Sequence, residues 1–266
     1  MAKTNLIWVR GAGELASAVA HLLFRLGYPV MMSEIDPPLA IRRPVTFSDA
    51  ILSGQTVVEN VTATYYPSIA KLDFPLDHIP LFCDDVTQLR QLSPDVIVDC
   101  RMLKHELTDI RDWASLIIGL GPGFHTEKNC HAIIETKRGH DLGRVITAGS
   151  AIADTGIPGI IGGKSVQRLV RSPDDGRVKW QVSFGDLVDP DQVLGFLNSD
   201  IKILAPTGGM VRGLISEATP VFSGLKIGDV DPRGAEVNYL QISDKARTIA
   251  HGVTEAILLY ERKRLK

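Results

Sequence analysis

The sequence predicts an α/β protein with a Rossmann-like, doubly wound and mostly parallel sheet, followed by a small all-β domain and a C-terminal helix. Three features of the chain favour this fold class. A glycine-rich turn joins an apolar run to a helical pattern near the N-terminus, further apolar runs alternate with helical patterns, and a sequence pattern repeats in the second half. The predicted domains are residues 1–165, 166–235 and 236–266.

The N-terminal turn has the spacing of a dinucleotide-binding motif. An apolar run at residues 6–9 precedes Gly11 and Gly13, and a second apolar run after the helix ends in Glu34. In this motif the first glycine permits a tight turn, the second lets backbone approach a pyrophosphate, and the acidic residue binds a ribose. The N-terminus of the helix that follows the turn supplies free N–H groups for the phosphates. A tight turn without a ligand is the alternative.

The composition is that of an ordinary globular protein. Of 266 residues, 44% are hydrophobic and 23% are charged, which is enough to bury one large core or two ordinary ones. A formal net charge of −2 gives no reason to expect nucleic acid, and no apolar run reaches membrane-spanning length. The first residues lack a signal-peptide pattern, and three cysteines without C-x-x-C spacing disfavour a disulfide scaffold. A cytoplasmic location is therefore expected.

Later apolar runs continue the α/β alternation. Residues 57–64 alternate like a strand pair that turns at Glu59 and Asn60, which predicts a small hairpin. A helix is predicted over residues 86–92. Buried strands are predicted at residues 79–82, 95–100 and 115–119.

Two segments that follow the predicted strands suit anion binding. Gly121 and Gly123 lie in a loop that can form an anion-binding nest, with a plain wide turn as the alternative. Arg138 in the next polar run suits phosphate or carboxylate, and His140 lies beside it. These residues are expected to close the second side of a dinucleotide site.

An arginine pair is expected at the ribose end of the same site. Arg42 and Arg43 would contact the sugar or a terminal group such as a 2′-phosphate, unless they lie on a solvated turn. The predicted cofactor-binding residues are Gly11, Gly13, Glu14, Glu34, Arg42, Arg43, Gly121, Gly123, Arg138 and His140.

The reactive side chains do not define a catalytic centre. Cys100 is a candidate carrier of sulfur or selenium if it ionises, although a buried inert thiol is the competing interpretation. His125 and His140 are candidate proton donors. Together with Cys130 and His131 these histidines lack a recognised ligand spacing, so no metal site is predicted.

The second half contains an internal duplication. The pattern Pro-x-x-Gly-x-Val at Pro173 recurs 33 residues later at Pro206. Such a pair of half-repeats resembles the barrel-sandwich hybrid of biotinyl and lipoyl domains. The segment between the halves, residues 197–200, has no lysine, which favours an unmodified docking or structural module. A capping serine, Ser243, then opens the predicted C-terminal helix.

Five segments of the chain carry a resemblance to a known family: residues 9–16, 39–43, 119–124, 135–144 and 224–233. They resemble the YqeB-type proteins, which are accessory proteins encoded with selenium-dependent molybdenum hydroxylases. The resemblance implies a maturation factor that binds a nucleotide or a molybdopterin dinucleotide and docks a client hydroxylase. It does not identify catalytic residues.

Two other functions stay open at this point. An NAD(P)-dependent oxidoreductase would use His125 or His140 beside a nicotinamide, although no separate catalytic domain of the usual kind follows the nucleotide-binding pattern. A nucleotide-sensing scaffold would bind without turnover. The sequence leaves a homo-oligomer open as well.

Overall fold

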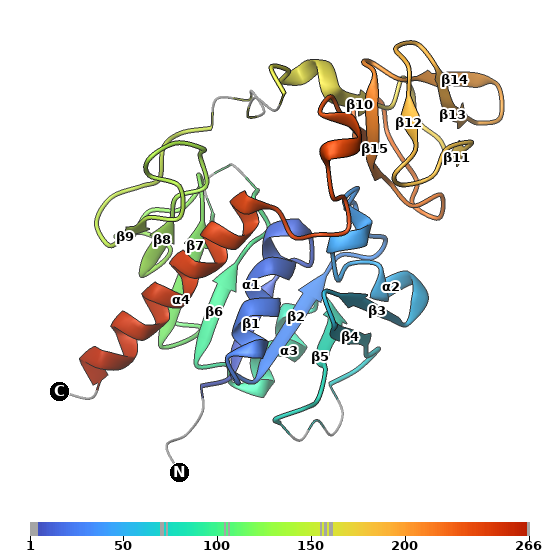
Figure 1. The fold of residues 1–266 in the computed structure, drawn as a ribbon. Coiled ribbons are helices and arrows are strands. Elements are labelled where there is room, and N and C mark those ends of the chain that lie inside the picture. Colours follow the sequence, from blue (N-terminus) through green and yellow to red (C-terminus); the bar gives the residue numbers. More distant parts are fainter. Residues whose placement is uncertain are drawn as a thin grey trace. The chain divides into compact units, whose positions relative to one another are not determined.

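The computed structural model describes residues 5–69, 72, 74–103, 105, 107–154, 156, 159 and 162–264. The chain divides into two compact units (Figure 1). The first consists of Met1–Asp36, Thr46–Thr155 and Ile242–Lys266, and the second of Pro37–Val45 and Gly156–Gln241.

The first unit contains the strands β1 (Ile7–Arg10), β2 (Val30–Glu34), β3 (Gln55–Val58), β4 (Val61–Tyr65), β5 (Ile79–Cys83), β6 (Val96–Asp99), β7 (Leu116–Leu120), β8 (Ala132–Ile134) and β9 (Val145–Ile146). They form one sheet with the order β3-β4-β5-β2-β1-β6-β7-β8-β9. The seven inner strands are parallel, whereas β3 and β9 pair antiparallel at the edges. The strand order reverses between β1 and β6. Open α/β sheets bind ligands beyond the carboxyl ends of strands at such a point.

The predicted Rossmann-like, doubly wound sheet is wrong. A doubly wound sheet has a helix in each crossover, so that helices cover both faces. The described residues between β6 and β7, and between β7 and β8, contain no helix. The C-terminal helix α4 (Asp244–Arg264) instead packs against α1 (Glu14–Arg25) and contacts β7, β8 and β9 (Figure 1). The apolar runs misled because a buried parallel strand reads the same whichever segment covers it.

Local sequence accounts for α1 and for the core beside it. The helix begins after Gly13, and the buried side chains of Ala16, Val19 and Leu23 recur at helical spacing. Gly27 ends the helix with a φ of +87°. Apart from α1 and α4, the helical segments described in the unit are single turns: α2 (Ala50–Ser53), α3 (Val86–Leu89) and η2 (Arg90–Leu92).

The predicted hairpin at residues 57–64 is confirmed. Strands β3 and β4 pair antiparallel, and Glu59 and Asn60 turn between them with φ values of 43° and 68°. Two consecutive residues of positive φ define the tight turn that suits the twist of a hairpin.

The second unit consists of two antiparallel sheets with the orders β10-β16-β15-β12 and β11-β13-β14. Its core is apolar and includes Leu194, Val211 and Ile227, each fully buried. Its elements are η1 (Arg43–Val45), η3 (Val166–Arg168), β10 (Leu169–Arg171), β11 (Val178–Trp180), β12 (Leu187–Val188), β13 (Val193–Leu197), β14 (Ile201–Leu204), β15 (Gly209–Leu214), β16 (Lys226–Asp231) and η4 (Gly234–Glu236).

The two halves of the second unit use glycine in the same way. Gly176 and Gly209, which are 33 residues apart, have φ values of +154° and +148°. A Cβ at Gly176 would overlap Asn198, and one at Gly209 would overlap Asp231. Asn198 and Asp231 are also 33 residues apart. The backbone therefore repeats with the sequence, while the comparison with biotinyl and lipoyl domains stays a prediction.

Candidate functional site

The glycine turn lies at the carboxyl end of β1, where the strand order reverses. Gly11 has a φ of +95°, and a Cβ there would stand 3.5 Å from the carbonyl carbon of Cys100. Gly13 caps α1 without a side-chain hydrogen bond, and no described atom lies within 4 Å of a Cβ built on it. The helix N-terminus, with its positive dipole end, is thus open beside Gly13. The structure brings Gly11, Gly13 and Glu14 together, as the sequence predicts.

Glu34 closes the turn from the end of β2. One carboxylate oxygen accepts the N–H of Ala12 at 2.7 Å, and the other accepts the N–H of Ile35 at 2.8 Å. Burial raises the pKa of Glu34, and the nearby Asp84 adds to this, although the two N–H bonds oppose the rise. The acidic residue of the motif therefore stands beside the turn.

A buried ionic network crosses the same edge of the sheet. The guanidinium of Arg10 bonds Asp84 at 3.2 Å and Asp99 at 3.4 Å. Arg101 donates three side-chain bonds to Asp99, the shortest of 2.6 Å between Nη2 and Oδ2. Each charge is thus paired, which a buried ion requires.

Two tryptophans hold the centre of this network. The guanidinium carbon of Arg10 lies 5.2 Å from the ring centroid of Trp8 and 5.5 Å from that of Trp113. Trp8 also donates to Ser33, whose hydroxyl donates to Asp84 at 2.8 Å. Sequence reasoning missed this network. One feature of the sequence could have indicated it: the charged residue Arg10 directly follows the apolar run at residues 6–9, at the end of a buried strand.

The loop after β7 packs closely against its neighbours at both of its predicted glycines. A Cβ at Gly121 would stand 2.5 Å from Oγ1 of Thr136, and one at Gly123 would stand 2.6 Å from the carbonyl oxygen of His105. The protein itself therefore occupies the space beside both glycines. Their absent side chains serve close packing between the loops after β6, β7 and β8.

Burial disfavours ionisation of the candidate reactive thiol, Cys100. Cys100 is buried, and burial together with Asp99 raises the pKa of its thiol well above the usual value. A thiolate is disfavoured there. His125 lies in the loop after β7, where its Nδ1 accepts the N–H of Glu127 at 3.2 Å. Burial likewise raises the pKa of Cys130 to about 12.

Arg42 and Arg43 belong to the second unit, whereas Glu34 belongs to the first. Arg42 is buried, and the guanidinium of Arg43 lies 5.9 Å from the ring centroid of Phe184. This is a cation–π contact within the second unit.

Arg138 and His140 lie in a loop that packs on α4. Arg138 forms a bidentate ion pair with Asp244, with N–O distances of 2.8 and 3.1 Å, and His140 is exposed. A Cβ at Gly143 would stand 2.8 Å from the carbonyl oxygen of Thr248, and one at Gly252 would overlap the carbonyl oxygen of Gly143. This loop therefore attaches to α4 through backbone contact.

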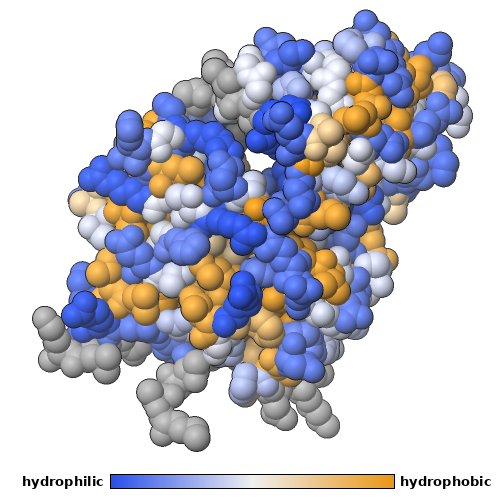
Figure 2. All heavy atoms as spheres, in the orientation of Figure 1, coloured by the Kyte–Doolittle hydropathy of each residue, from blue (hydrophilic) through white to orange (hydrophobic). Residues whose placement is uncertain are grey.

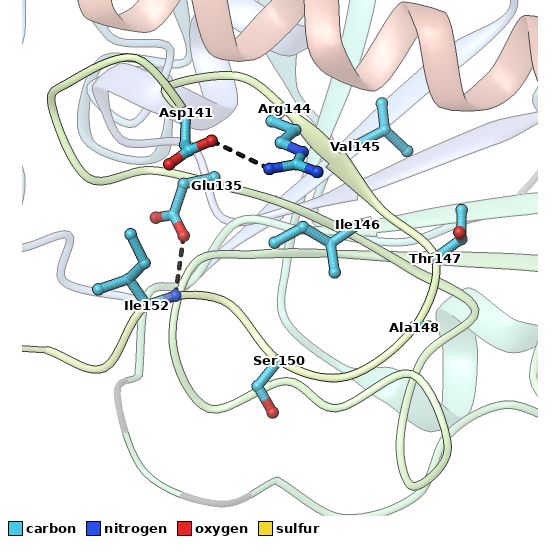
Figure 3. Close-up of a pocket in the computed structure, with 9 residues that line it drawn as sticks. All are labelled: Glu135, Asp141, Arg144, Val145, Ile146, Thr147, Ala148, Ser150 and Ile152. Atoms are coloured by element: carbon cyan, nitrogen blue, oxygen red, sulfur yellow. Dashed lines mark hydrogen bonds and ion pairs between the residues drawn. The ribbon is translucent and has the colours of Figure 1, made fainter.

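A cavity of about 440 Å³ opens at the carboxyl end of β8 (Figure 3). Glu135 is buried there, and its carboxylate accepts the N–H groups of Thr136, Lys137 and Ile152 at 2.7–2.8 Å. These bonds hold the loop in place. The other residues that line the cavity are Asp141, Arg144, Val145, Ile146, Thr147, Ala148 and Ser150.

Among the described residues, no group of three or more His, Cys, Asp or Glu side chains is arranged to hold a metal ion. His131 uses Nδ1 to accept the N–H of Ile117 at 2.9 Å. No helix in the described ranges combines the length and the apolar character needed to span a bilayer. Figure 2 shows hydrophobic residues interspersed with hydrophilic ones on the face drawn.

The chain is similar in sequence to one curated protein, YqeB. No protein-family model matches it. Over 265 residues, 98% of its length, the chain is 41% identical to a protein of Escherichia coli K12 described as uncharacterized protein YqeB. The match covers 49% of that protein, so the chain spans about half the length of this curated relative. The resemblance to YqeB-type proteins is thereby supported along nearly the whole chain.

Two solved structures match the chain distantly. An aspartoacylase family protein from Mesorhizobium loti has a TM-score of 0.30 at 14% identity, over 85% of this chain and 84% of that one. A succinylglutamate desuccinylase/aspartoacylase from Rhodobacter sphaeroides has a TM-score of 0.28 at 13% identity, over 85% of each chain. Scores this low do not establish a shared fold.

Proposed function

We propose that this chain is an accessory factor in the maturation of a selenium-dependent molybdenum hydroxylase. In this role its first unit binds a dinucleotide, the dinucleotide form of molybdopterin, at the glycine turn. The observation that carries the proposal is the open space at Gly13, at the start of α1 and at the point where the strand order reverses. The molybdenum and selenium context rests on the resemblance to YqeB-type proteins.

The residues at the turn fit a pyrophosphate next to a ribose. The N–H groups at the start of α1 would donate to the phosphates, and the absent side chain of Gly13 leaves room for their approach. Glu34 would accept from a ribose hydroxyl, because each carboxylate oxygen can accept more than the one bond that it now has. The chain's contribution is binding and orientation, and the bound cofactor would supply the redox chemistry.

The second unit would dock the client hydroxylase. It is a separate all-β unit with its own core, and the repeat-like halves carry no lysine at residues 197–200 to support a swinging arm. A cytoplasmic location, where such hydroxylases would be assembled, is part of the same proposal.

Native mass spectrometry of the purified protein, followed by calorimetric titration with NAD, NADP and a cytidine dinucleotide, tests this function. Retention of a pterin species, or selective uptake of the cytidine dinucleotide, is the expected result. Binding that excludes the cytidine compound and is accompanied by hydride turnover would instead favour the oxidoreductase, with His125 as the first residue to replace. Binding of a nucleotide that alters affinity for the client without turnover or a pterin would favour the scaffold.

A further inference from the structure

An Asp-x-Arg arrangement recurs three times in the described chain. In each case the arginine N–H and its guanidinium both bond the carboxylate two residues earlier: Arg101 on Asp99, Arg111 on Asp109 and Arg233 on Asp231. The geometry is closely matched, since the Nη2–Oδ2 distances are 2.6, 2.6 and 2.8 Å. The three arginines therefore differ mainly in what surrounds them.

The backbone at Arg101 lies against the glycine turn. The backbone nitrogen of Arg101 lies 3.6 Å from the position of a Cβ on Gly11, so the loops after β1 and β6 touch there. Asp99 is 1% exposed and also bonds Arg10, whereas the side chain of Arg101 is 26% exposed. Arg101 is thus the member of the ionic network that reaches solvent most.

The network leaves one face of Arg101 available. Its Nε and Nη2 both bond Asp99, and Nη1 has no hydrogen bond to any residue that the structure describes. A guanidinium offers donors along more than one edge, so one edge can rest on a carboxylate while another meets a phosphate. Because Asp99 is itself fixed by Arg10, the guanidinium is oriented before a ligand arrives.

We propose that Arg101 contacts the pyrophosphate of the ligand at the glycine turn, with Asp99 and Arg10 as the residues that position it. This inference rests on the proposed function and adds a contact that the glycine motif does not include. The ligand group it selects is a phosphate or pyrophosphate, because that is the group that the start of α1 also favours.

The test uses Arg101→Gln with Arg111→Gln as a control. Arg111 bonds Asp109 as Arg101 bonds Asp99, but its Nη1 already donates to the carbonyl oxygen of Glu127. Each protein is titrated with inorganic pyrophosphate and with the cytidine dinucleotide, and thermal unfolding checks folding. The expected result is that Arg101→Gln weakens both by at least about tenfold, that Arg101→Lys recovers part of the loss, and that Arg111→Gln binds like wild type.

Three outcomes separate the two proposals. Wild-type protein that binds pyrophosphate in an Arg101-dependent way but no dinucleotide supports this contact and contradicts the proposed function. Equal binding by wild type and Arg101→Gln, or equal losses in Arg101→Gln and Arg111→Gln, overturns the contact alone. Wild-type protein that binds neither compound overturns both.

Discussion

The turn at Gly11 and Gly13 and the loop at residues 138–144 both belong to the first unit. The sequence predicts ligand-binding residues in both, with Arg138 and His140 in the second. At Gly13 a Cβ would meet no described atom within 4 Å, whereas at Gly143 it would stand 2.8 Å from the backbone of Thr248. The first glycine leaves space open at a helix N-terminus, and the second brings two backbones together. Glycine content alone therefore does not separate a binding loop from a packing loop, and the neighbouring element decides.

Replacing Gly252, which packs against Gly143, should have the largest effect on stability. In Gly252→Ala the new methyl would overlap the carbonyl oxygen of Gly143, which outweighs the gain of about 1 kcal/mol that alanine usually brings to a helix. We expect the free energy of unfolding to fall by about 1–3 kcal/mol, measured by chemical denaturation. A variant as stable as wild type would show that the loop and α4 do not pack as described.

The same substitution at Gly13 should weaken ligand binding more than it lowers stability. Gly13 has a φ of −69° and open space, but alanine is a poorer N-cap than glycine, so Gly13→Ala should lower the free energy of unfolding by no more than about 1 kcal/mol. A methyl at the start of α1 would hold the phosphates away from the backbone, and dinucleotide affinity should fall at least about tenfold, or about 1.4 kcal/mol. Calorimetric titration measures this, and unchanged affinity would remove Gly13 from the site.

A smaller effect concerns how α4 is held at its start. Glu59 accepts from Arg247 at 2.6 and 2.7 Å and from the N–H of Ile242 at 2.8 Å. Burial acts to raise the pKa of Glu59, but these bonds outweigh it and lower the pKa. The pair should therefore stabilise the fold above pH 4.5 and lose this contribution as the pH falls through the lowered value.

The variant Arg247→Gln checks this pH dependence. It should be about 1 kcal/mol less stable than wild type at neutral pH, because the arginine is partly exposed and solvent screens the pair. The gap should narrow as denaturation is repeated at pH 4 and below. A gap that is constant with pH would assign the loss to packing of the arginine stem.

The smallest effect is expected at Arg138. Its pair with Asp244 is solvent-exposed, with 75% of the Asp244 side chain accessible, so Arg138→Gln should cost less than about 0.5 kcal/mol. Dinucleotide affinity should not change. A clear loss of affinity in a titration of this variant would return the loop at residues 138–144 to the binding site.

Sequence reasoning was sufficient where a pattern depends on local geometry. The turn at Gly11 and Gly13, the helix that follows it and the hairpin at Glu59 all follow from spacing and turn chemistry. It failed where the outcome depends on a distant segment. The cover of β7 and β8 comes from α4, more than 100 residues further along, and no local pattern indicates which segment will supply it. The fold class was predicted wrongly for that reason.

The site shows the same division. Gly11, Gly13, Glu14 and Glu34 lie together as predicted, because consecutive parallel strands bring their carboxyl ends to one edge. Arg138 instead forms an ion pair with Asp244 of α4. The buried ionic network was missed because a single sequence does not show which charges meet across strands.

Hydrogen–deuterium exchange of the wild-type protein, with and without a saturating cytidine dinucleotide, most directly tests whether the turn at Gly11 and Gly13, and not the loop at residues 138–144, binds the ligand. We predict slower exchange at residues 11–16 when the ligand is bound, and unchanged exchange at residues 138–144. Protection confined to residues 138–144, or binding that leaves residues 11–16 unprotected, would contradict this prediction.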